Sequence, residues 1–188
     1  DWMELRGAFE PGYRVVRDRE GRYDQDVNLR GGLRLLSAHL EGSALQEGLW
    51  ADRFAFDLSG IGDPIQHVGF EVRADDRYDL RIHSDRDAYV FRSAGDPHPF
   101  DTLRDSDGVR LSVKASKGLE LRFTSERLRR EGDANLDHWF PSYLSFPVAA
   151  TVDYEGLTQS AGLDGSSGAL RYGASWTWGV AEDDSMRL

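Results

Sequence analysis

The chain has 188 residues, a formal net charge of −10 and no cysteine. Its length suits a single domain over 1–188, and its acidic balance argues against nucleic-acid binding, which needs a basic stripe. Without cysteine there can be no disulfide, no thiolate metal site and no CxxCH haem attachment. No run of about 18 apolar residues occurs, so no membrane helix is expected.

Strand-like alternation recurs along the whole chain, while helical periodicity is nearly absent. We predict nine strands, which lie at 4–16, 25–40, 51–60, 66–75, 78–91, 107–116, 119–130, 148–163 and 169–180. Within these segments the apolar residues repeatedly share one face. Examples are Val68, Phe70 and Val72; Val109, Leu111 and Val113; and Leu119, Leu121 and Phe123.

The segment 169–180 shows this pattern most clearly. Leu170, Tyr172, Trp176 and Trp178 fall on one face, and small or polar residues, beginning with Arg171, fall on the other. A transmembrane β-strand has this form, with lipid on one side and a wet lumen on the other. A soluble half-buried strand alternates in the same way, so the prediction depends on how often the pattern repeats.

The links between the predicted strands are of two kinds in the second half of the chain. Short links with turn chemistry lie at 75–77, 116–118 and 164–168, and long links lie near 92–106 and 131–147. Alternation of short turns and long loops is typical of an antiparallel membrane barrel. We therefore predict an all-β fold, an antiparallel transmembrane β-barrel or part of one, with about 8–10 strands in this chain. Because bacterial barrels have even strand numbers, nine strands favour part of a larger barrel over a miscounted small one.

Four segments resemble one family in their order and spacing. They are 22–35 (RYDQDVNLRGGLRL), 52–64 (DRFAFDLSGIGDP), 98–104 (HPFDTLR) and 147–154 (PVAATVDY). In this order they resemble the outer-membrane β-barrels of porin–cytochrome conduits, the MtrB/PioB-like group, in patches over residues 13–180.

The resemblance implies a scaffold of the bacterial outer membrane and not an enzyme. Barrels of that family sheath a multihaem c-type cytochrome that carries electrons across the outer membrane. The implied partners are outer-membrane lipid, such a cytochrome and further barrel chains, because this chain is too short to enclose a cytochrome alone. It would be a fragment, a reduced relative or one chain of an assembly. The haem would belong to the partner, so no cofactor is assigned to this chain.

We assign no catalytic, cofactor-binding or metal-binding residue. The five histidines, His39, His67, His83, His98 and His138, lack HxxxH or HExxH spacing and are interpreted as polar residues of a lumen or of loops. The run 105–108 (DSDG) is interpreted as a loop turn, because the first ligand position of an EF-hand would be Leu103. Adjacent strand residues point to opposite faces, so His83 and Ser84 cannot form a catalytic pair.

Charged and aromatic residues follow the same two-faced pattern. Glu120, Arg122 and Glu126 are predicted to point into the lumen, and further arginines that alternate with apolar neighbours predict an Arg-lined interior. These arginines are Arg34, Arg73, Arg81, Arg110 and Arg171. Aromatic residues gather toward segment ends, as in interfacial girdles. They are Trp50, Phe54, Phe56, Tyr78, Tyr89, Trp139, Phe140, Tyr143, Phe146, Trp176 and Trp178.

Three alternatives stay open at this point. A general porin or structural barrel would have the same strands around a water-filled or side-chain-filled lumen. A soluble extracytoplasmic β-sandwich that binds a ligand such as carbohydrate would have shorter strands and a dry core between two sheets. An outer-membrane hydrolase is disfavoured, because no GxSxG motif is present.

Overall fold

The computed structural model describes residues 2–15, 31–46, 49–91, 100–139 and 145–187. These residues form one antiparallel sheet of nine long strands and one short strand, without a helix in the described part of the chain. The strands are β1 (Met3–Arg14), β2 (Gly32–Ala44), β3 (Arg53–Ile61), β4 (Ile65–Ala74), β5 (Tyr78–Phe91), β6 (Phe100–Ser116), β7 (Leu119–Trp139), β8 (Ser145–Ser167), β9 (Leu170–Asp183) and β10 (Met186–Arg187). The predicted all-β antiparallel class is confirmed.

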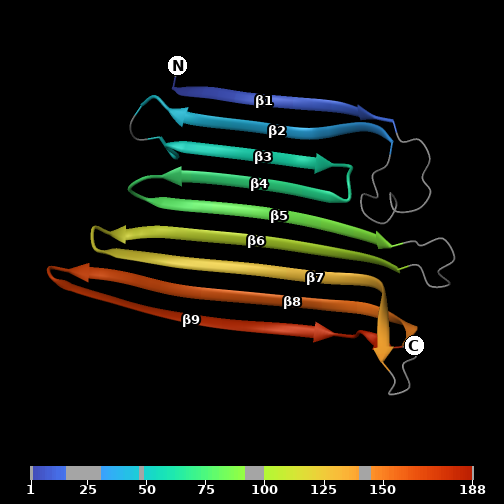
Figure 1. The fold of residues 1–188 in the computed structure, drawn as a ribbon. Coiled ribbons are helices and arrows are strands. Elements are labelled where there is room, and N and C mark those ends of the chain that lie inside the picture. The colour runs from blue at the N-terminus through green and yellow to red at the C-terminus, as the bar shows by residue number, and fades with distance from the viewer. Residues whose placement is uncertain (1, 16–30, 47–48, 92–99, 140–144, 188) are drawn as a thin grey trace.

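The sheet is an up-and-down meander, in which each strand pairs with the next one along the chain (Figure 1). Pairing is longest between β7 and β8, where the register runs from Leu119 opposite Gly165 to Trp139 opposite Ser145. The short β10 continues beyond β9 along the same side of β8. Strands that are consecutive in the chain therefore lie side by side, and all the described strands belong to a single layer.

The two edges of the sheet are not joined to each other in the described residues. Here β1 pairs only with β2, and β9 pairs only with β8. In a meander of nine long strands the first and ninth run in the same direction, so direct pairing of β1 with β9 would be parallel. An antiparallel barrel needs an even number of strands. This sheet is consistent with part of an antiparallel barrel and is not closed.

Several strands extend further than the sequence pattern predicts. The fifth predicted strand, 78–91, matches β5 residue for residue. The second, predicted at 25–40, overlaps β2 at 32–44 and ends four residues early, and its residues 25–30 lie outside the described part of the chain. Most of the predicted long links at 92–106 and 131–147 is strand, because β6 begins at Phe100, β7 reaches Trp139 and β8 begins at Ser145. The predicted loop turn at 105–108 lies within β6. Backbone pairing along these strands continues through charged sequence that lacks an apolar face. A strand of this kind has no alternation of apolar and polar residues, so the sequence pattern does not reveal it.

Three short turns lie at the same end of the sheet (Figure 1). They span 75–77, 117–118 and 168–169, and the described turn at 62–64 lies at the other end. Gly168 has a φ of 61°, a left-handed conformation that glycine adopts without strain in a tight hairpin turn. The first end thus carries the short hairpin turns of the second half of the chain, and we call it the short-turn end.

The described part of the chain has no hydrophobic core between two layers. Its buried hydrophobic residues are Ala51, Val72, Ala74 and Ala150, three of them alanines. Large hydrophobic side chains instead remain exposed on the sheet. Among the described residues there is no helix with the length and apolar character to cross a bilayer.

Candidate functional site

The strand register divides the sheet into two chemically different faces. Residues that are directly opposite in neighbouring strands share a face, so an alternating pattern in one strand is carried across all of them. One face, called the apolar face here, carries mostly aliphatic and aromatic side chains. It includes Leu5, Phe9, Leu40, Phe54, Phe56, Leu58, Val68, Phe70, Val72, Leu80, Ile82, Val109, Leu111, Leu121, Phe123, Ala161, Leu163, Tyr172, Trp176 and Trp178.

The apolar face is not covered by any other part of the described chain. Trp176, near the middle of β9, is 73% exposed, and Phe9 on β1 is 68% exposed. Soluble monomers rarely leave contiguous apolar patches of this kind, and large ones mark membrane or protein contacts. The face therefore needs an apolar environment that the described residues do not supply.

In β5–β8 this face becomes charged away from the short-turn end. The Nε atom of Arg86 lies 3.7 Å from Asp105, and Nε of Arg127 lies 3.0 Å from Glu155. The Ser84 hydroxyl donates a hydrogen bond of 2.7 Å to Asp107. The apolar band thus ends partway along these strands and is followed by hydrated ion pairs. Of these residues only Asp105 lies in a predicted long link; the others lie inside predicted strands, where charged residues interrupt the apolar alternation that defined the face.

Not all the aromatic residues lie at strand ends. Tyr78 is the first residue of β5 and Phe54 the second residue of β3, as a girdle would require, but Phe56 lies further inside β3 and Trp176 and Trp178 lie inside β9. Phe140 and Tyr143 lie outside the described residues, and of Trp139 and Phe146 the structure describes only the backbone. Tyr89 shares its face with Arg81 of the same strand, and Trp50 lies in the link before β3. The aromatics inside β3 and β9 therefore belong to the apolar face, and the predicted set does not form two bands at the strand ends.

The opposite face, called the polar face here, carries the alternating charges. The predicted set Glu120, Arg122 and Glu126 shares this face with Arg73, Arg81, Arg110 and Arg171. The remaining predicted arginine, Arg34, lies at the end of β2, where its Nε is 3.1 Å from Asp63. Nη1 of Arg14 reaches the same carboxylate at 2.6 Å. Asp63 thus ties β1 and β2 to the link between β3 and β4.

Three histidines lie on the polar face, each beside a carboxylate. His39 Nδ1 is 2.6 Å from Asp57, and His67 Nδ1 is 2.6 Å from Asp85. His83 spans β6 to reach Glu126 at 3.4 Å. No group of three or more metal-ligating side chains is found among the described residues. His98 lies outside them, and only the backbone of His138 is described.

The bridge between His83 and Glu126 depends on a glycine. Gly108 lies directly between them in the register, and a Cβ added there would overlap both side chains. The neighbouring Ser84 points to the apolar face, where it bonds Asp107. The prediction that His83 and Ser84 face opposite sides is confirmed.

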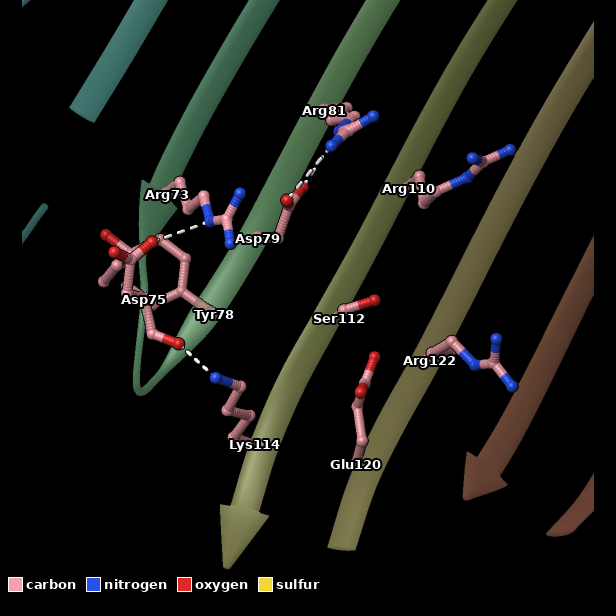
Figure 2. Close-up of a pocket in the computed structure, with 11 residues that line it drawn as sticks. Arg73, Asp75, Tyr78, Asp79, Arg81, Arg110, Ser112, Lys114, Glu120 and Arg122 are labelled. Carbon is pink, nitrogen blue, oxygen red and sulfur yellow. Dashed lines mark hydrogen bonds and ion pairs between the residues drawn. The ribbon is translucent and has the colours of Figure 1, made fainter. Parts of the chain in front are cut away.

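The polar face is hollowed near the short-turn end. A depression of about 380 Å³ lies over β4–β7, and Figure 2 shows the side chains that line it. Arg73 pairs with Asp75 at 2.8 Å, and Arg81 pairs with Asp79 at 3.0 Å. Sequence reasoning placed several of these arginines on one face but could not show that the register gathers them around one hollow.

The polar face of β8 and β9 differs from this charged region. Between Asp164 and the end of β9 it carries small, uncharged side chains. They are Gly156, Thr158, Ser160, Gly162, Gly173, Ser175, Thr177 and Gly179. The polar face therefore has a charged part over β2–β7 and a smooth part over β8 and β9.

Comparison with known proteins adds no relative to this picture. No family model, no curated protein and no solved structure matches the chain.

Proposed function

We propose that this chain is part of the wall of an outer-membrane β-barrel that sheaths a multihaem c-type cytochrome. The apolar face would meet lipid, and the polar face would line the lumen. The observation that carries the proposal is the division of the sheet into an exposed apolar face and a charged face across nine registered strands. A membrane barrel requires this division on every strand.

Lipid suits the apolar face better than a second sheet does. In a β-sandwich two sheets pack about 10 Å apart and bury their inner faces against each other. The described residues form one sheet only, with exposed tryptophans. The strands β6, β7 and β8 are also far longer than the five or six residues usual in soluble sheets. This favours a membrane wall over the soluble sandwich.

The open edges favour a wall that is completed by other strands. Because β1 and β9 run in the same direction, an antiparallel barrel closes only with an odd number of additional strands. Unpaired strand edges readily pair with another chain. We propose that strands which residues 1–188 do not contain, such as those of further barrel chains, complete the barrel.

The cytochrome as the lumen partner is supported by two features. The family resemblance implies it, and the smooth part of the polar face over β8 and β9 would allow another protein to approach the wall closely. The wall would act by exclusion, keeping lipid away from the haem chain and holding it across the membrane. This requires no catalytic residue.

A general porin is the second candidate, and the charges of the polar face favour it. The ion pair Arg81–Asp79 and the hydrogen-bonded pair His67–Asp85 are about half exposed or less and keep contact with solvent. Such pairs suit a water-filled lumen as well as a protein-filled one. The strands and their lipid contact would be unchanged.

Purification from native membranes tests the proposal. The protein is extracted in a mild detergent, and the visible spectrum of the purified complex is recorded. A haem Soret band that stays with this cysteine-free chain supports the conduit. A colourless protein that requires detergent supports the porin instead. A protein that stays in solution without any detergent refutes the membrane wall.

A further inference from the structure

The hollow in the polar face is unevenly charged. Its lining has five cationic side chains, from arginines and Lys114, against the three carboxylates of Asp75, Asp79 and Glu120. Asp75 and Asp79 pair with Arg73 and Arg81 within the lining, and Arg122 pairs with Asp164 outside it. The lining therefore keeps a formal excess of two positive charges.

Arg110 lies at the centre of this region. It is directly opposite Arg81 on β5, and like charges in directly opposite positions destabilise a sheet. Arg81 has its own carboxylates on the far side, Asp79 at 3.0 Å and Glu71 at 3.5 Å. Arg110 makes no ion pair or side-chain hydrogen bond with any residue that the structure describes, and Figure 2 shows its guanidinium extending over the sheet.

Two further donor groups lie near Arg110. Ser112, two residues along the same face of β6, is opposite Arg122 of β7 on one side and Asp79 of β5 on the other. Arg122 pairs with Asp164 of β8, so its partner lies outside the hollow. Arg110, Ser112 and Arg122 thus offer guanidinium and hydroxyl donors beside one another. Asp79 and Glu120 line the same hollow, but neither forms an ion pair with Arg110.

We propose that this space binds a small, multiply charged oxyanion of the phosphate type. Guanidinium groups bind phosphate oxygens through paired, charge-assisted hydrogen bonds, and a hydroxyl adds a neutral donor. An anion above Arg110 would also relieve its repulsion with Arg81. Under the proposed function the site faces the lumen, but its chemistry does not depend on what covers the apolar face.

Calorimetric titration of the whole chain in zwitterionic detergent with inorganic pyrophosphate tests the site. We expect saturable binding that weakens as salt is added, because salt screens exposed charges. Arg110→Gln should weaken binding by about tenfold to a hundredfold, the range expected for hydrogen bonds to a charged group. Arg171→Gln is the matched control, because it removes the same charge from the same face on β9, and it should change binding by less than about twofold.

Far-UV circular dichroism verifies that each variant keeps its sheet. If Arg110→Gln no longer forms the sheet, the Ser112→Ala variant is used instead. This variant keeps every charge and removes only the hydroxyl donor, and we expect it to bind pyrophosphate several-fold more weakly. The absence of saturable binding by the wild-type chain, or equal losses in Arg110→Gln and Arg171→Gln, would overturn the proposal. Either result leaves the membrane wall untouched, because the titration reports on the polar face alone.

Discussion

Replacing Phe56 by arginine should destabilise the chain strongly in a bilayer. Phe56 lies in the interior of β3 on the apolar face, directly between Leu40 of β2 and Phe70 of β4. On the lipid face of a barrel an arginine at the bilayer midplane costs about 2–4 kcal/mol. This corresponds to a loss of about 30-fold to 1000-fold in the ratio of folded to unfolded protein.

The adjacent residue provides a matched control. Ala55 points to the polar face, directly between Glu41 and Glu71. The same arginine placed there meets two carboxylates and water, so Ala55→Arg should change stability by less than about 0.5 kcal/mol. Ser84→Arg completes a depth series on the apolar face. It lies where that face becomes charged, opposite Asp107, and should cost no more than about 1 kcal/mol.

Urea unfolding in phospholipid vesicles measures these differences. Tryptophan fluorescence reports the transition, since none of the three substitutions changes a tryptophan. The expected order of stability is wild type and Ala55→Arg together, then Ser84→Arg, and Phe56→Arg last. Equal costs for Phe56→Arg and Ala55→Arg would refute the assignment of the two faces, and equal costs for Phe56→Arg and Ser84→Arg would refute the depth dependence.

Two further substitutions test contacts that the register creates. Asp63→Asn removes the carboxylate that Arg14 and Arg34 share, and should lower the free energy of unfolding by about 1.5–3 kcal/mol in the same urea assay; an unchanged midpoint would contradict this structural role. Gly108→Val places a side chain where His83 bridges to Glu126, and should cost about 1–3 kcal/mol through overpacking. Gly162→Val, on the smooth part of the polar face where an added Cβ meets only ordinary contacts, should cost less, and a reversed order would contradict the bridge.

The strand pattern of the chain was predictable where two signals agree. The bounds of β5 follow from clear alternation that begins after the turn at 75–77, and the start of β7 follows from the turn at 117–118. In these places turn chemistry marks the end of a strand and the apolar period marks its interior. The face of each residue then follows from a period of two, which is why His83 and Ser84 could be assigned to opposite sides.

The long extensions of β6, β7 and β8 were not predictable in this way. Their outer parts carry charges on both faces, as Asp105 and Arg104 illustrate, and such sequence resembles a solvated loop. What makes it strand is pairing with a neighbouring chain segment that is equally polar. The charges then form pairs between strands, as Arg127 and Glu155 do at 3.0 Å.

Local sequence was sufficient to define an all-β chain with one apolar and one charged side, because side chains alternate along any strand whatever its neighbours are. The register between strands required the tertiary structure, because it depends on backbone hydrogen bonds between segments that are distant in sequence. That register places Arg110 beside Arg81, carries His83 across Gly108 to Glu126, and brings Arg14 to Asp63. The hollow and the open edges are consequences of the same pairing, and no single segment contains the information for either.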